Sequence, residues 1–154
     1  MDVASFSNVS LEGSKKRAGQ TRKILVVEDD KDVTALLRVV LLDTVGDAQV
    51  DWATSFEDSV KHLIENSDIV QSIPYDLIIA DIFLEGNGIG LDLFKLINRT
   101  YSEVPFLIIS SLPYEMVLDS LGQDKKDNFT FLPKPFQLSQ CKDKVKNLIA
   151  RKLN

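Results

Sequence analysis

The sequence is poor in cysteine and in long apolar runs, and each shortage excludes a class of protein. A single cysteine, Cys141, cannot form an internal disulfide, so a disulfide-stabilised secreted scaffold is excluded. We interpret Cys141 as a small packing residue of a helix. No apolar run approaches the ~20 residues that a membrane-spanning helix needs, and the N-terminus lacks the apolar core of a secretory signal. We therefore expect a protein of the reducing cytoplasm with no membrane partner.

Acidic residues outnumber basic ones, and histidine is scarce. Lys and Arg number 18 against 23 Asp and Glu, which gives a net charge of −5. This balance argues against nucleic-acid binding by this chain alone. The single histidine, His62, lies beside the apolar stripe of a predicted helix, so we interpret it as a surface or hydrogen-bonded histidine rather than a catalytic base.

The residues that are present fit one globular domain with a short extension. The chain has 154 residues, of which 44% are hydrophobic and 27% charged. Residues 1–21 are rich in Ser, Gly, Lys and Arg and have no sustained periodicity, which predicts a flexible arm. Residues 22–154 then form a single domain.

Strand-like and helix-like segments alternate along this domain. Short apolar runs predict strands at 23–27, 49–53, 77–80, 106–109 and 129–132. Apolar residues at helical spacing follow each run, and Pro113 suits the first turn of the fourth helix. The pattern predicts an α/β fold, a doubly wound five-stranded parallel sheet with helices on both faces. Right-handed crossovers would bring the C-terminal ends of all strands to one edge.

Polar residues follow the predicted strands at that edge. They are Glu28, Asp29 and Asp30 after the first strand, Asp81 after the third, Ser110 and Ser111 after the fourth, and Lys134 after the fifth. Crowded carboxylates repel unless a cation joins them, and an all-oxygen ligand set favours Mg²⁺. A lysine and a hydroxyl suit a phosphoryl group, and an aspartate can accept one covalently. Each residue alone is an ordinary strand-end polar group, but together they predict a phosphoryl-transfer site.

These motifs resemble the receiver domain of two-component response regulators over residues 22–153. The similar segments are Ile-Leu-Val-Val-Glu-Asp-Asp, Asp-Leu-Ile-Ile-Ala-Asp, a strand closed by Ser, and Lys-Pro-Phe. The resemblance implies the flavodoxin-like strand order 2-1-3-4-5.

The resemblance also implies an acceptor and a metal site. Asp81 matches the aspartate that is phosphorylated from a histidine kinase or a histidine phosphotransfer protein. The implied Mg²⁺ ligands are the carboxylates of Glu28, Asp29 and Asp81 and the backbone carbonyl of Phe83.

Other matched residues would sense the phosphate. Ser110 matches the switch hydroxyl, Lys134 the phosphate-pairing lysine and Phe131 the switch aromatic, and Pro135 is expected after a cis peptide bond. The implied downstream target binds the face formed by the fourth helix, the fifth strand and the fifth helix.

The sequence departs from the family pattern near the acceptor. Glu85 stands where the family often has proline, and the loop to Gly90 is one residue longer than the shortest family version. Phe131 lacks the phenol oxygen of the commoner tyrosine. We expect the added charge and loop length to alter kinase access and the rate of dephosphorylation. No required chemical group is missing, so we expect the domain to be phosphorylated.

The leading hypothesis is a phosphorylation-controlled signalling switch of a two-component or phosphorelay pathway, which acts by protein contact. It would not be an enzyme beyond autophosphorylation from small donors and autodephosphorylation. One alternative is an interaction module that keeps the fold but works without phosphate. Another is the receiver part of a DNA-binding regulator whose output domain is absent here. A phosphohydrolase that uses Asp81 as nucleophile is disfavoured because no histidine stands at a strand end.

Overall fold

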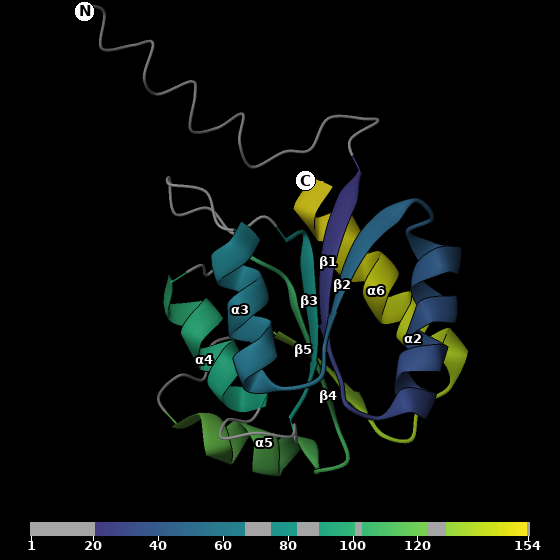
Figure 1. Cartoon of the computed structure of the whole chain (residues 1–154). Coiled ribbons are helices and arrows are strands. Elements are labelled where there is room, and N and C mark those ends of the chain that lie inside the picture. The colour runs from purple at the N-terminus through teal and green to yellow at the C-terminus, as the bar shows by residue number, and fades with distance from the viewer. Residues whose placement is uncertain (1–20, 67–74, 83–89, 101–102, 123–128, 154) are drawn as a thin grey trace, which may run out of the picture.

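The computed structural model describes residues 21–66, 75–82, 90–100, 103–122 and 129–153, which form one parallel sheet covered by helices on both faces (Figure 1). The strands are β1 (Arg22–Val27), β2 (Ala48–Ala53), β3 (Leu77–Asp81), β4 (Phe106–Ser110) and β5 (Phe129–Pro133). The helices are α2 (Lys31–Thr44), α3 (Phe56–Asn66), α4 (Gly90–Thr100), α5 (Tyr114–Leu121) and α6 (Leu138–Leu153). The strand order is β2-β1-β3-β4-β5 and every pair is parallel, which confirms the predicted fold class.

The uninterrupted apolar runs of the strands arise because both faces of the sheet are buried. Along β1, Ile24 and Val26 face a core that α2 and α6 complete, whereas Leu25 and Val27 face a core built with α4 and α5. Cys141 lies fully buried in the first of these cores, and burial raises the pKa of its thiol to about 11. It packs as the small apolar residue that the sequence predicts.

Several predicted boundaries are wrong by a residue, and three of these differences lie near the site. Asp81 and Ser110 belong to β3 and β4 rather than following them, since Asp81 still pairs with Ile109 and Ser110 with Pro133. Pro113 lies one residue before α5 instead of in its first turn, because its ψ of 149° is extended.

The N-terminal edge of the sheet holds a partly buried polar network. The Tyr75 ring is fully buried, and its hydroxyl donates to Asp51 Oδ2 at 2.6 Å. Lys23 Nζ lies 3.9 Å from the same carboxylate oxygen and donates to Asn66 Oδ1. Burial and this carboxylate raise the pKa of Tyr75, so the phenol stays protonated. The network fixes β1, β2 and α3 at the edge opposite to the predicted site.

The C-terminal ends of the strands meet at the other edge, at the bottom of Figure 1. Phe83 and Glu85 lie outside the described residues, as do residues 1–20 of the predicted arm. No helix in the described part of the chain is long and apolar enough to cross a membrane.

Candidate functional site

Asp81 is the centre of the polar cluster at the C-terminal edge. It ends the central strand β3, and only 6% of its surface is exposed. Lys134 Nζ donates to Asp81 Oδ2 at 2.7 Å and to Glu28 Oε2 at 3.1 Å. One cation therefore joins carboxylates that come from β3 and from the end of β1.

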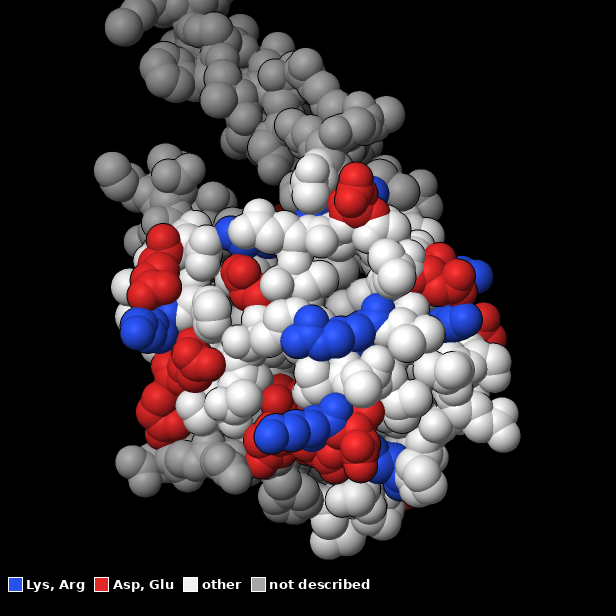
Figure 2. Space-filling view, turned by 45° about the vertical axis from the view of Figure 1, so that its right-hand side comes forward, with Lys and Arg blue, Asp and Glu red and all other residues white. Residues whose placement is uncertain are grey.

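A third carboxylate completes the cluster. Glu28, Asp29 and Asp81 each place one oxygen within 4.8 Å of the others. Figure 2 shows acidic side chains gathered at the lower end of one face, the end at which the strands terminate. The structure thus brings together the three predicted carboxylate ligands and the predicted lysine, although they lie far apart in the sequence.

The turn between β1 and α2 positions two of these carboxylates. Asp30 does not join the cluster but caps α2, since its side chain accepts hydrogen bonds from the backbone N–H groups of Asp32 and Val33. Its own N–H donates to Glu28 Oε1 at 3.0 Å. The helix cap and the orientation of Glu28 are therefore coupled through one residue.

The cluster holds three carboxylates but only one bonded lysine, Lys134. Burial raises the pKa of Glu28 to about 7, and the negative charge of Asp81 adds to this, against the opposing effects of the Asp30 N–H and Lys134. Burial alone would lower the pKa of Lys134, but its hydrogen bond to Asp81 and the charge of Glu28 raise it. Lys134 bonds two of the three clustered carboxylates, and the oxygen-only set fits a hard divalent cation such as Mg²⁺.

Ser110 is held at the end of β4 beside the lysine segment. It is fully buried, and its Oγ accepts a hydrogen bond from the Leu112 N–H at 2.8 Å. The Lys134 N–H donates to the Ser110 carbonyl at 2.7 Å, which ties the ends of the two strands together. The peptide bond between Lys134 and Pro135 is cis. Ser111 is exposed.

Phe131 lies on β5 and contacts an aromatic residue that the sequence analysis did not single out. Its ring centroid is 5.4 Å from that of Tyr114, at the start of α5, and Tyr114 is 44% exposed. The Tyr114 ring also lies 6.3 Å from Phe129. In the sequence, the only hint of this contact is that Tyr114 directly follows Pro113, at the predicted start of the fourth helix.

Gly90 is a second residue that the sequence analysis did not connect with the site. A Cβ at this position would lie 1.7 Å from the backbone oxygen of Asp81, and the Gly90 N–H donates to the Ile82 carbonyl at 2.8 Å. The start of α4 is thus packed directly against the backbone of the acceptor strand. Only glycine permits this approach.

Comparisons with known proteins give one consistent result. A family model described as "response regulator receiver domain" matches residues 24–146. The nitrogen assimilation regulatory protein NtrX of Azorhizobium caulinodans is 31% identical over 114 residues, which cover 73% of this chain and 23% of that protein. The chain therefore spans about a quarter of the length of this curated relative.

Solved structures show the same fold. The non-phosphorylated HemR receiver domain from Leptospira biflexa has a TM-score of 0.67 at 24% identity, with 84% of this chain and 95% of that chain covered. The NtrX receiver domain from Brucella abortus has a TM-score of 0.64 at 22% identity, with coverage of 82% and 98%. At these identities the likeness concerns the fold alone.

Proposed function

The chain belongs to the response regulator receiver domain family, and on this premise we propose that it is a phosphorylation-controlled signalling switch of the cytoplasm. Receiver domains are generally non-catalytic switch domains that interact with histidine kinases or phosphotransfer proteins. The proposed partners are a phosphodonor of that kind and a downstream protein, which this chain binds by direct contact.

The observation that carries the proposal is the position of Asp81. Its buried carboxylate lies at the end of the central strand, bonded to Lys134 and clustered with two further carboxylates. In the proposed step, an Asp81 oxygen attacks the phosphorus of a phosphohistidine and forms the acyl phosphate. The P–N bond breaks, and the imidazole nitrogen keeps its electron pair. Lys134 Nζ pairs with a phosphoryl oxygen during the transfer.

Receiver domains bind Mg²⁺ at an acidic pocket, and the donor set of this site fits such an ion. We propose Glu28, Asp29, Asp81 and the carbonyl of Phe83 as its ligands. When bound, the ion offsets the negative charge of the phosphoryl oxygens.

Ser110 and Phe131 are the proposed switch residues. The Ser110 hydroxyl accepts a hydrogen bond from the Leu112 N–H in this structure. After phosphorylation, a phosphoryl oxygen on Asp81 would accept a hydrogen bond from this hydroxyl and draw Ser110 toward Asp81. Phe131 would then fill the space that Ser110 leaves. This shift changes the surface of α5, β5 and α6, where Tyr114 contacts Phe131, and so biases binding of the downstream target.

Intact-mass spectrometry with a small phosphodonor and Mg²⁺ tests the proposal. We expect the wild-type chain to gain one phosphoryl group and Asp81→Asn to gain none. Asp43→Asn is the matched control, because Asp43 is an exposed aspartate of α2 that pairs with Lys142. A wild-type chain that stays unmodified would rule out the switch mechanism and favour an interaction module that works without phosphate.

One observation favours a second arrangement, in which the chain is the receiver part of a longer regulator. The NtrX relative is a regulatory protein of which this chain matches only 23%. In such a regulator, the surface of α5, β5 and α6 would act on an output domain of the same polypeptide, for example a DNA-binding domain. The length of the intact open reading frame distinguishes this arrangement from a stand-alone receiver.

A further inference from the structure

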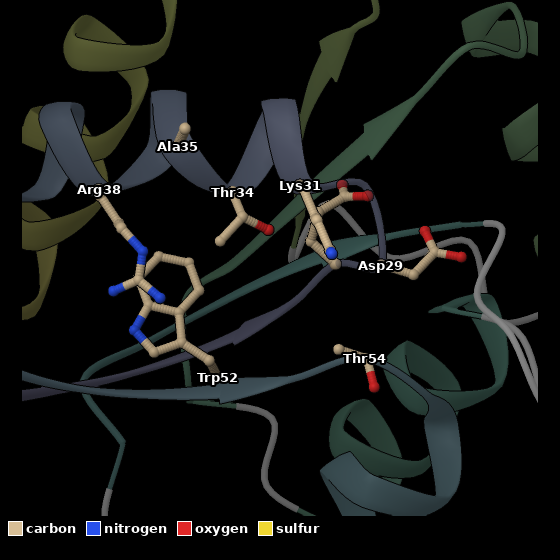
Figure 3. Close-up of a pocket in the computed structure, with 8 residues that line it drawn as sticks. Asp29, Lys31, Thr34, Ala35, Arg38, Trp52 and Thr54 are labelled. Atoms are coloured by element: carbon tan, nitrogen blue, oxygen red, sulfur yellow. The ribbon is translucent and has the colours of Figure 1, made fainter.

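A cleft adjoins the acidic cluster on the side of the edge strand β2. It has a volume of about 380 Å³ and lies between the first turns of α2 and the end of β2. Figure 3 shows Lys31 and Arg38 projecting from α2 toward β2, where Trp52 lies, with Thr54 directly after the strand. A volume of this size is within the range of small-molecule pockets.

The basic groups of this cleft are Lys31 and Arg38, both exposed side chains of α2. Neither Lys31 nor Arg38 forms an ion pair with a described carboxylate. The Arg38 guanidinium instead stacks on the Trp52 ring, 4.2 Å from its centroid. This contact holds the guanidinium over the cleft with its N–H edge available, since the stacking uses only its face.

These groups define the chemistry of a ligand. A guanidinium binds a carboxylate or phosphate through paired hydrogen bonds, and an ammonium adds a second positive charge. The Trp52 ring and Ala35 offer apolar surface beside them. Glu28 and Asp29, which belong to the acidic cluster, line one end of the cleft and repel negative charge there. The fitting ligand therefore has one oxyanionic end and an apolar body.

We propose that the cleft between α2 and β2 is a binding site for a small carboxylate, held by Arg38, Lys31 and Trp52. The carboxylate could be a free molecule or the acyl group of an acyl phosphate whose phosphoryl group lies at Asp81. The acyl phosphate fits as a source because the cleft adjoins Asp81: Glu28 and Asp29 line the cleft and also cluster with Asp81.

The second source rests on the proposed function, and its chemistry balances. An Asp81 oxygen forms the new bond to phosphorus while the bond between phosphorus and the acyl oxygen breaks. The leaving carboxylate takes the electron pair, so no proton is required. Arg38 and Lys31 would stabilise the charge of that carboxylate within the cleft.

The fluorescence of Trp52, the single tryptophan, together with calorimetry, tests binding directly. We expect benzoate to give a saturable response in low salt and its neutral analogue benzamide to give none. Arg38→Gln and Lys31→Gln should each weaken benzoate binding about fivefold, as expected for the loss of one partly exposed ion pair. Lys61→Gln, an exposed lysine of α3, is the matched control and should bind like the wild type.

Three outcomes would overturn the site: no saturable response to benzoate, equal binding of benzamide, or equal weakening by Lys61→Gln. Phosphorylation rates with acetyl phosphate and phosphoramidate then separate the two sources. If Arg38→Gln slows only the acyl donor, the acyl group occupies the cleft. If both rates are unchanged while benzoate binding weakens, the ligand is a free carboxylate. If neither donor modifies Asp81, the proposed function fails, whereas the binding result stands independently.

Discussion

At the scale of the residue, Lys134 explains how three carboxylates remain close together in the folded chain. It bonds two of them directly, yet the cluster still carries an excess of negative charge. Burial is the main cause of the raised pKa of Glu28, and the negative charge of Asp81 adds to it. The same imbalance makes the site receptive to a metal ion.

The first prediction concerns the pH dependence of the metal-free protein. The pKa of Glu28 rises from 4.5 in the unfolded reference to about 7, so folding takes up a proton between these values. The stability that protonated Glu28 contributes is complete below the lower value and is lost as pH rises through about 7. In EDTA, we expect the melting temperature to fall across this range. Glu28→Gln cannot titrate, so an equally steep fall in that variant would contradict the assignment.

The second prediction concerns the opposite edge of the sheet. Tyr75→Phe removes the donor to Asp51 within a partly buried network and should cost about 1 kcal/mol of stability. Chemical denaturation measures this change. Because the network lies at the N-terminal edge, phosphorylation of Asp81 should proceed at the wild-type rate. A slower rate would mean that the two edges of the sheet are coupled.

At the scale of the element, the sequence predicts the ends of the strands to within a residue but not how these ends are fixed. Apolar runs closed by Asp81 and Ser110 locate the site because parallel strands finish at one edge. The pattern does not reveal that Asp30 caps α2, since any of three adjacent acidic residues could do so. Nor does it reveal the contact of Gly90 with Asp81, which depends on the approach of α4 to β3.

The third prediction tests that approach. A Cβ on Gly90 would lie 1.7 Å from the Asp81 oxygen, so Gly90→Ala must displace α4 or the acceptor strand. We expect a loss of more than about 2 kcal/mol in stability and a slower phosphorylation of Asp81. Gly46→Ala is the matched control: its φ is +71° with nothing within 4 Å of an added Cβ. It should cost about 1 kcal/mol from backbone strain and leave phosphorylation unchanged. Equal effects of the two substitutions would contradict the close contact.

At the scale of the whole molecule, the alternation of strands and helices is sufficient to predict the architecture. Continuous apolar strands indicate a sheet buried on both faces, and the two observed cores agree. The strand order β2-β1-β3-β4-β5 followed only from the resemblance to receiver domains, and it too agrees. The cleft between α2 and β2 is not predictable in this way. Lys31, Arg38 and Trp52 are ordinary surface or packing residues in the sequence, and only the folded chain brings them together.

The fourth prediction links the metal to the stability of the whole domain. Because an ion that binds only the folded state stabilises it, Mg²⁺ at a hundredfold excess over its Kd should add about 2.7 kcal/mol. Differential scanning calorimetry should show a rise of several degrees in the melting temperature. Asp81→Asn removes one proposed ligand and should reduce this rise. An unchanged melting temperature in millimolar Mg²⁺ would contradict the metal site.

The central claim is that Asp81 accepts the phosphoryl group, and peptide mapping of the phosphorylated chain tests it most directly. After reaction with phosphoramidate and Mg²⁺, mass spectrometry of the digested protein should locate one phosphoryl group on the peptide that contains Asp81. No modified peptide should form in EDTA or in Asp81→Asn. A phosphoryl group on Asp29, Ser110 or any other residue, with Asp81 unmodified, would contradict the account.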